Sequence, residues 1–389
     1  MIIPDSNKDR IAIIVVGYNR LKSIERLLDS VSQAEYPYDD IPLIISIDAS
    51  GNKELYSYVN AFQWDKGPKY VNIQEERLGL KKHILTCGAL TEFFKGIIVL
   101  EDDLFVSPYY YHYAMQAIEK YGDDNRIAEI ALYKNSCNGF VKLPFEQMHD
   151  AADVYLAQDV CTWGECWTWQ MWSGFKKWYC SHNDEDVQKV DMPERIKQWE
   201  RAWSKYYNAY VVSERKYIVY PNVSLTTNFS DAGEHGGDSN GEVQVNLQMG
   251  EINYRMPEIS SLIKYDIYSN NELLYDWVGL SSSEMSLDLY GIKHPKYYKR
   301  YLLTVKERPY NVVKEYGLIM RPIELNVKFG IKGKGINLYD TSCSRKNRSK
   351  STYSLQVANF FLNTVRIDVI KLYFFSFMKN SIKNKLYGK

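Results

Sequence analysis

Apolar and polar residues follow two alternating patterns through the first 120 residues. Continuous apolar runs rich in β-branched residues, such as IAIIVVG at 11–17, predict strands that are buried on both faces. Between such runs apolar residues recur at helical spacing, as Ile24, Leu27, Leu28 and Val31 do. Strands are expected over 11–17, 42–50, 69–74 and 96–100, and helices after residue 17, over 54–65, within 77–94 and over 108–121. This alternation predicts an α/β domain with a mainly parallel sheet, in which ligands bind beyond the carboxyl ends of the strands.

The pattern loosens after residue 125, where aromatic residues become frequent. Most of the Trp side chains between 163 and 178 are expected to be core. Trp163 is the exception. The following Gly164 opens a loop, and the Trp163 ring and the loop backbone are expected to border a sugar. Further on, His235 lies in a loop rich in Gly and Asp and is a candidate ligand.

Beyond residue 250 the strand and helix alternation does not continue. We therefore expect one domain over 1–250 and a mostly helical C-terminal extension over 251–389. The end of the extension mixes aromatic residues with positive charge, since six Lys or Arg follow from Arg366 onward against one Asp. Such a segment suits the surface of an anionic membrane, and a helix that docks on its own domain or on a partner explains the pattern equally well.

Composition excludes some classes of protein. Lys and Arg together number 48, as do Asp and Glu, so there is no net positive charge to bind nucleic acid. The 45% of hydrophobic residues allow a sizeable core. Six cysteines without a CxxC pair, no signal-peptide pattern and no apolar window long enough to span a bilayer predict a cytoplasmic protein with reduced thiols.

Three acids, Glu101, Asp102 and Asp103, directly follow the apolar run GIIVL. Adjacent carboxylates repel one another and are costly at a strand exit unless a cation or hydrogen-bond donors meet them. One interpretation is a polar loop after a strand. The other is a site for a divalent metal at the carboxyl end of the sheet, and it is favoured because Asn19, Arg20 and Asp48 fall at neighbouring strand ends.

The motifs VVGYNR, SIDAS, LGLKKH and VLEDDLFVSP, in this order and spacing, resemble the GT-A-type nucleotide-sugar glycosyltransferases. The resemblance covers about residues 10–240. It is strongest to the mannoside N-acetylglucosaminyltransferases and to bacterial glycosyltransferases of surface polysaccharides. It implies a GT-A, Rossmann-like fold for the catalytic domain over 1–250, a UDP-sugar donor and Mn²⁺ or Mg²⁺ as cofactor.

The resemblance also implies roles for single residues. Arg20 matches an arginine near the nucleotide, and Asp48 and His83 match residues that contact uracil. Glu101 and Asp102 match residues that reach the ribose and sugar, and Asp103 matches the acid that ligates Mn²⁺. Asn228, Asp231, Gly233 and His235 match a loop that lies over the donor or the acceptor in the bacterial relatives.

The acceptor-activating base departs from the family pattern. Inverting members need a general base, which in the bacterial relatives is an Asp after a Trp. The matching position here is Ser204, which cannot act as a base. Glu200 lies one helical turn earlier if 197–203 (KQWERAW) is helical, and Glu165 beside Trp163 is a second candidate.

The expected function is a metal-dependent, inverting transfer of a sugar from a UDP-sugar to a glycan or lipid-linked glycan in bacterial surface polysaccharide synthesis. A non-catalytic protein that binds nucleotide-sugars or carbohydrates is an alternative, given Ser204. A sugar nucleotidyltransferase ranks lower, because residues 15–23 (VVGYNRLKS) lack a Gly-rich, basic phosphate loop.

Overall fold

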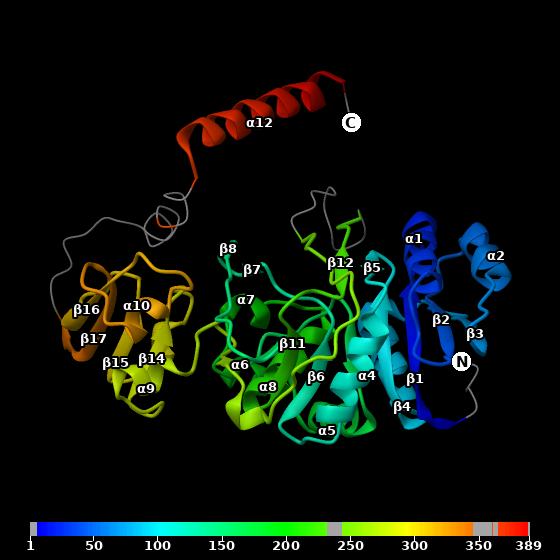
Figure 1. Cartoon of the computed structure of the whole chain (residues 1–389), viewed down its shortest axis with the longest axis horizontal. Coiled ribbons are helices and arrows are strands. Elements are labelled where there is room, and N and C mark those ends of the chain that lie inside the picture. The colour runs from blue at the N-terminus through cyan, green and yellow to red at the C-terminus, as the bar shows by residue number, and fades with distance from the viewer. Residues whose placement is uncertain (1–5, 232–242, 345–359, 361–364, 388–389) are drawn as a thin grey trace. The chain divides into compact units, whose positions relative to one another are not determined.

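The computed structural model describes residues 6–231, 243–344, 360 and 365–387 (Figure 1). The chain folds into two compact units. The first holds Met1–Ser136 and Gln147–Leu273, and the second holds Cys137–Glu146 and Leu274–Lys389. The predicted boundary at residue 250 between a catalytic domain and an extension stays a prediction.

The first unit is built on a nine-stranded sheet in the order β13-β9-β11-β6-β10-β4-β1-β2-β3. Its strands are β1 (Asn7–Gly17), β2 (Leu43–Ile47), β3 (Lys69–Ile73), β4 (Phe94–Glu101), β6 (Ile127–Ala131), β9 (Val154–Ala157), β10 (Glu165–Trp167), β11 (Tyr217–Pro221) and β13 (Lys264–Tyr265). Strand β10 is antiparallel to β4 and β6, and β9 is antiparallel to β11, while the other neighbours are parallel. The mainly parallel mixed sheet is thereby confirmed.

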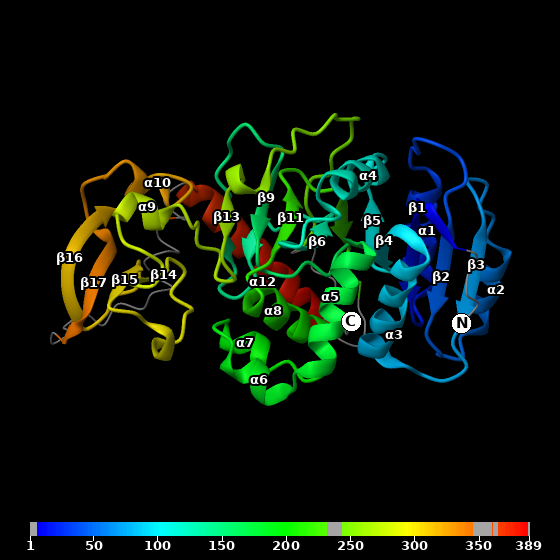
Figure 2. The ribbon, with the colours of Figure 1, turned by 90° about the horizontal axis from the view of Figure 1, so that it is seen from below.

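Helices cover both faces of this sheet. They are α1 (Leu21–Ser32), α2 (Lys53–Ala61), α3 (Gly79–Gly88), α4 (Tyr110–Tyr121), α5 (Trp169–Ser181), α6 (Asp184–Lys189), α7 (Glu194–Lys197) and α8 (Trp203–Ser213), with a short 3₁₀ turn at Ala89–Glu92. In Figure 2, α3, α5 and α8 lie along one side of the sheet and α4 along the other. Gly96 of β4 leaves room for Ile118 of α4, since a Cβ there would come within 2.9 Å of the Ile118 side chain.

Strand register gathers three glutamates on one face. Glu165 of β10 lies opposite Val99 of β4 and opposite Ala131 of β6. Because side chains alternate along a strand, Glu101 and Glu129, two residues from those partners, share its face. All three belong to the strands at the centre of the sheet.

A short antiparallel pair joins the end of β4 to a distant part of the chain. Strand β5 (Leu104–Val106) pairs with β12 (Thr226–Asn228), with Leu104 opposite Asn228. The amide of Phe229 extends the pair by donating to the carbonyl of Asp103 at 2.9 Å. This pairing brings residues 228–231 beside the acidic triplet.

The second unit contains a four-stranded sheet in the order β14-β15-β17-β16. These strands are β14 (Met285–Asp288), β15 (Tyr301–Thr304), β16 (Tyr310–Gly317) and β17 (Gly335–Ser344), accompanied by β7 (Cys137–Asn138), β8 (Leu143–Pro144), α9 (Leu274–Val278) and α10 (Leu325–Lys328). The expected helix at the end of the chain is α12 (Ile367–Tyr387), but the sheet was not expected from the sequence. Among the described residues, no helix has the length and apolar character that a membrane span needs.

Candidate nucleotide-sugar and metal site

Parallel strands bring the predicted residues to one edge of the sheet. Tyr18, Asn19 and Arg20 follow β1, Asp48 follows β2, and the acidic triplet closes β4, which pairs with β1. Asn19 is exposed, and its carbonyl accepts a hydrogen bond from the Asn52 side chain at 3.2 Å. The edge therefore collects the donor-binding candidates of the first half of the chain.

Asp48 is buried and its carboxylate is occupied by backbone amides. It accepts hydrogen bonds from Leu78 at 2.7 Å, Gly79 at 2.8 Å and Ala49 at 2.9 Å. Gly79 has a φ of 71°, a conformation that favours glycine, and it begins α3. Asp48 thus satisfies free amides at the start of that helix and fixes the loop before it. Its predicted contact with uracil stays a prediction.

His83 lies on α3 and is 2% exposed. Its Nε2 atom is 2.7 Å from the Ser46 hydroxyl. Burial lowers the pKa of His83 to about 4, although the nearby Asp48 acts in the opposite direction. The ring is therefore neutral at neutral pH and fixed by Ser46, and its predicted role toward uracil also stays a prediction.

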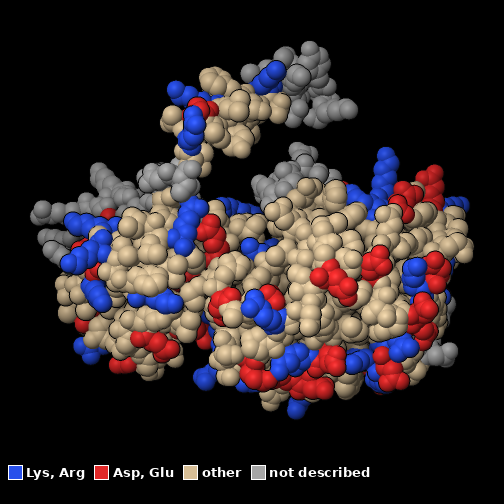
Figure 3. Space-filling view, in the orientation of Figure 1, with Lys and Arg blue, Asp and Glu red and all other residues tan. Residues whose placement is uncertain are grey.

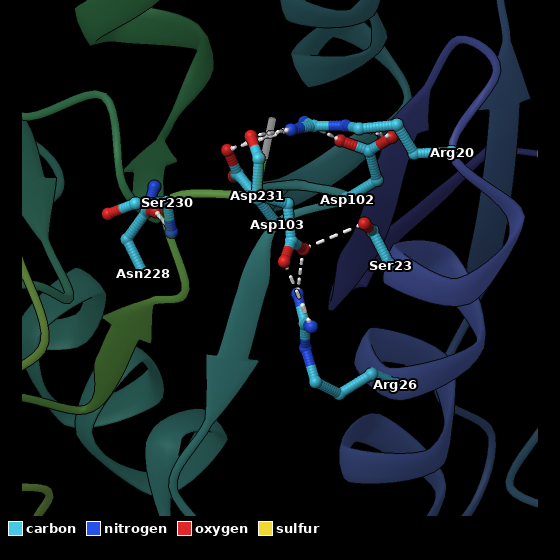
Figure 4. A network of polar contacts seen from close by, with 8 residues as sticks. All are labelled: Arg20, Ser23, Arg26, Asp102, Asp103, Asn228, Ser230 and Asp231. Atoms are coloured by element: carbon cyan, nitrogen blue, oxygen red, sulfur yellow. Dashed lines mark hydrogen bonds and ion pairs between the residues drawn. The ribbon is translucent and has the colours of Figure 1, made fainter. Parts of the chain in front are cut away.

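Arg20 meets two acids of the triplet (Figure 4). Its guanidinium donates to both carboxylate oxygens of Asp102, including an Nε contact of 3.3 Å, and to Asp103 Oδ2 at 3.4 Å. Burial raises the pKa of Asp102 to about 6 although Arg20 opposes this, and burial with Asp103 and Asp102 raises the pKa of Glu101 to about 8. The raised pKa favours the uncharged form of Glu101, which would reduce the repulsion within the triplet.

Asp103 has one carboxylate oxygen without a partner. Its Oδ1 atom is buried and accepts no hydrogen bond, whereas Oδ2 contacts Arg20. A buried, unpaired carboxylate oxygen is costly and suits a cation. Within residues 6–231 and 243–344 and the described part of the tail, no three His, Cys, Asp or Glu side chains gather as a metal site. Asp103 therefore fits an ion whose other ligands come from outside the protein.

Asp231 follows the β5–β12 pair and is held by α1. Its carboxylate accepts hydrogen bonds from Ser23 at 2.7 Å and from both terminal nitrogens of Arg26. These contacts hold the pKa of Asp231 below its usual range, although burial acts against them. Asp231 was expected from the family pattern, but the buried Ser23 and the partly buried Arg26 were not, because a serine and an arginine within a helix carry no signal for such a contact in the sequence.

Trp163 is half-buried, and its ring lies 4.7 Å from that of Tyr133. Its carbonyl accepts a hydrogen bond from Thr226 Oγ1 at 2.6 Å. Gly164 has a φ of 98°, so this loop favours glycine there. The loop is thus fixed next to β12, while the predicted contact of Trp163 with a sugar stays a prediction.

Glu165 is fully buried at the start of β10. One carboxylate oxygen accepts from the Gly164 amide at 3.1 Å, and the other has no hydrogen-bond partner. Burial, followed by the charges of Glu129 and Glu101, raises the pKa of Glu165 well above its usual range. Burial thus shields Glu165 from solvent and favours its uncharged form.

The premise that placed Glu200 on a helix with Ser204 is wrong. Helix α8 begins at Trp203, and Glu200 lies in a bend between α7 and α8, where it is exposed. Helix α7 ends at Lys197, and residues 198–202 between α7 and α8 are not helical. Ser204 is buried as the second residue of α8. His235, the remaining candidate, lies outside the described residues.

Three comparisons with known proteins bear on this site. Residues 12–155 match the sequence profile described as "Glycosyl transferase family 2". The match spans β1 through β9 and so includes the acidic triplet. No curated protein matches the chain.

Solved structures show weaker likeness. S. aureus TarS 1-349 in complex with UDP-GlcNAc has a TM-score of 0.38 and 14% identity, over 58% of this chain and 60% of that one. Mannosyltransferase PcManGT from Pyrobaculum calidifontis, in complex with GDP-Man and Mn²⁺, has a TM-score of 0.34 and 14% identity, over 57% and 59%. GalNAc-T7 with UDP, GalNAc and Mn²⁺ has a TM-score of 0.37 and 11% identity, over 55% and 42%.

The chain matches 60% of the length of TarS 1-349. The family match stands on the sequence of residues 12–155, which holds the motifs VVGYNR, SIDAS, LGLKKH and VLEDDLFVSP. At the level of the family, the match of residues 12–155 to this profile confirms the resemblance to nucleotide-sugar glycosyltransferases.

Proposed function

We propose that the chain transfers a sugar from a UDP-sugar to a glycan or lipid-linked glycan acceptor, with inversion and with a divalent metal ion. The acceptor would belong to bacterial surface polysaccharide synthesis. The observation that carries the proposal is Asp103, which presents a buried, unpaired carboxylate oxygen at the carboxyl edge of the sheet, within the residues that match the family 2 profile. Such a site suits glycosyl transfer, because a bound divalent ion can neutralise the negative charge of the departing diphosphate.

Asp103 is the residue that would hold Mn²⁺ or Mg²⁺. Hard divalent ions prefer oxygen ligands, and a single protein carboxylate leaves the remaining positions to phosphate oxygens and water. When bound, the ion would neutralise charge on the nucleotide diphosphate as it leaves. We therefore propose that metal and nucleotide bind together, and the Mn²⁺ named with PcManGT and GalNAc-T7 is consistent with this.

The protein residues around Asp103 would orient the donor. Arg20 already holds Asp102 and Asp103 through hydrogen bonds, and its side chain is 22% exposed. Glu101, Asp102 and Asn19 are proposed to reach the ribose and sugar from the same edge. Asp48 and His83 are proposed to select uracil, directly or by holding the loop at Leu78 that precedes α3.

The acceptor side is proposed to use Glu200 or Glu165 as its base, with Trp163 and His235 beside the sugar. Glu200 is open to solvent, so an acceptor hydroxyl can reach it. Glu165 is closed to solvent in this structure and would have to become accessible.

A cytoplasmic protein that contacts the inner face of the cell membrane through α12 fits a lipid-linked acceptor. Exposed apolar side chains recur along this helix at Ile367, Phe374, Phe377 and Met378. Basic side chains accompany them, as Figure 3 shows for the visible face of the helix. On the visible side of the first unit, acidic and basic side chains are interspersed, a distribution that does not favour nucleic acid as a partner.

A second candidate is a non-catalytic protein that binds nucleotide-sugars. It is favoured by Ser204, which occupies the position of the family's base and cannot take a proton from an acceptor. Such a protein would bind UDP-sugar without releasing UDP.

A donor screen tests the proposal. Purified chain with Mn²⁺ is incubated with UDP-linked and GDP-linked sugars and a glycan acceptor mixture, and the released nucleotide is measured. We expect UDP release from at least one UDP-sugar and little GDP release. Binding of UDP-sugar without release would support the non-catalytic alternative, release of pyrophosphate would indicate a nucleotidyltransferase, and preferred GDP release would contradict the uracil assignment.

A further inference from the structure

Two arginines of α1, Arg20 and Arg26, contact acids of the site, and a series of hydrogen bonds and ion pairs connects them. Arg20 stands at the N-terminal end of α1, and Arg26 lies in its second turn. Figure 4 shows Arg20 beside Asp102 and Asp103, and Arg26 pairing with Asp231. Arg20 has a family counterpart and a proposed role, whereas Arg26 has neither.

Arg26 is fixed by two kinds of contact. Its two terminal nitrogens donate to the two carboxylate oxygens of Asp231, in a geometry that a lysine cannot reproduce. Its guanidinium also lies over the ring of Phe229 at 3.9 Å. Phe229 in turn packs against Phe105 of β5, with ring centroids 6.2 Å apart. Arg26 thus fastens the end of the β5–β12 pair to α1.

Asp231, which Arg26 holds, also contacts Arg20. The backbone carbonyl of Asp231 accepts a hydrogen bond from the Arg20 guanidinium at 3.0 Å, while its side chain is held by Arg26 and Ser23. The same Arg20 nitrogen donates to Asp103 Oδ2 at 3.4 Å. Four residues therefore form one continuous chain from Arg26 through Asp231 and Arg20 to Asp103.

Charge explains why Arg26 is needed. Asp231 lies close enough to Asp102 for their charges to interact, so three aspartates share this region with two arginines. Without Arg26, the Asp231 carboxylate would keep only Ser23 as a side-chain donor and would compete with Asp102 and Asp103 for Arg20. Movement of Arg20 toward Asp231 would release Asp103 from its present orientation.

Resting on the proposed function, we propose that Arg26 and Asp231 are positioning residues that hold Arg20 on Asp103, and that this arrangement sets the affinity of the site for metal-bound UDP. Neither residue needs to touch the nucleotide. Arg26 acts through Asp231, and Asp231 acts through Arg20.

The test measures UDP binding by calorimetry, with and without Mn²⁺, in three single variants of the full chain and in one double variant. Arg26→Met keeps the apolar stem over Phe229 and removes the charge, and Arg26→Lys keeps the charge without the paired contact. Arg10→Met is a matched control, because Arg10 also pairs with an aspartate, Asp40 at 3.6 Å, and lies over a tyrosine ring at 4.6 Å. Arg10 lies near the amino end of β1, away from the carboxyl edge.

We expect Arg26→Met to weaken Mn²⁺-dependent UDP binding about 10-fold, the size of a typical coupling between charged residues in contact. Arg26→Lys should lie between Arg26→Met and the wild type, and Arg10→Met should bind like the wild type. Adding Asp231→Asn to Arg26→Met should restore most of the lost affinity, because the uncompensated carboxylate that draws Arg20 away is gone.

Wild-type affinity in Arg26→Met would overturn the inference, and so would a loss that Asp231→Asn does not relieve. A purely structural role would lower the melting temperature of Arg26→Met without this rescue and would likewise count against positioning. Absence of Mn²⁺-dependent UDP binding in the wild-type chain would overturn the proposed function together with the inference, whereas wild-type binding that Arg26→Met leaves unchanged would overturn the inference alone.

Discussion

Asp103 carries its two carboxylate oxygens in different surroundings. Oδ2 contacts Arg20, and Oδ1 is buried without a hydrogen bond. Leaving an acceptor unpaired in the protein interior costs about 1–3 kcal/mol, more when the group is charged. Binding of the proposed cation would relieve that cost.

The base can be assigned by comparing two glutamates of opposite exposure. We expect Glu200→Gln to lower turnover roughly 100-fold, in line with general-base contributions, and to leave UDP affinity unchanged. Glu165→Gln should retain turnover and instead stabilise the fold. The pKa of Glu165 in the folded protein is raised well above its usual 4.5. The folded state therefore holds the proton more tightly than the unfolded state, and wild-type stability falls as the pH rises from about 4.5 toward the folded pKa. The advantage of Gln over Glu grows across the same range.

Turnover of each variant at saturating UDP-sugar, and unfolding by urea at several pH values, would measure both effects. A large loss of turnover in Glu165→Gln with normal turnover in Glu200→Gln would transfer the role to Glu165. Turnover close to wild type in both variants would contradict a glutamate base at either position.

Sequence predicted the acids of the site better than their surroundings. The acids Asp48 and Asp103, together with Arg20, were singled out because each follows a strongly apolar strand and matches a family motif; the structure places them at one edge of the sheet, and their roles stay predictions. The backbone amides that occupy Asp48 come from residues 49, 78 and 79, and this contact depends on the loop before α3, which periodicity does not describe. Arg26 was missed for a similar reason, since its partner Asp231 lies 205 residues away.

At the scale of elements, the strands that could be predicted from the sequence are those with a continuous apolar run. Strands β1, β2 and β4 contain continuous runs of buried residues rich in Ile and Val, and their sequences favour strands buried on both faces. Strands β10 and β13 have three and two residues, too few to show a period. The helix expected over 197–203 failed because short apolar spacing in KQWERAW also fits a bend followed by a new helix start.

Helix α12 carries the prediction that belongs to this scale. Exposed apolar side chains and the basic residues Arg366, Lys371 and Lys379 should bind it to anionic bilayers. We expect the chain to float with vesicles containing phosphatidylserine at low salt, to detach at high salt, and to stay unbound to neutral vesicles. The measurement is flotation of the wild type and of a chain with Lys371→Glu and Lys379→Glu.

A chain with Phe374→Ser and Phe377→Ser separates burial of aromatic rings from charge attraction. Both double variants should float less than the wild type. Unchanged flotation in both, or no flotation of the wild type at low salt, would show that this helix has another partner.

At the scale of the whole molecule, the two units differ in how far the sequence described them. The sheet of the first unit was expected up to β4, because its βα repeats are regular. The four-stranded sheet of the second unit was not, because β16 exposes much of its length and β17 has no sustained alternation of apolar and polar residues. We propose that the first unit binds the nucleotide and that α12 of the second unit contacts the membrane.

The central claim is that Asp103 binds a divalent ion only together with the nucleotide. Calorimetry of UDP with and without Mn²⁺ tests it most directly, on the wild type and on Asp103→Asn, which keeps the size of the side chain and removes its charge. Asp153→Asn serves as a control, since Asp153 is another aspartate of the first unit that pairs with an arginine, Arg255 at 3.6 Å, outside the triplet.

We expect tight UDP binding by the wild type only when Mn²⁺ is present, and no measurable heat from Mn²⁺ alone, because one carboxylate is too few ligands to hold the ion. In Asp103→Asn the Mn²⁺-dependent part of the binding should disappear, with the melting temperature little changed and Asp153→Asn unaffected. Mn²⁺-dependent UDP binding that persists in Asp103→Asn would contradict the account.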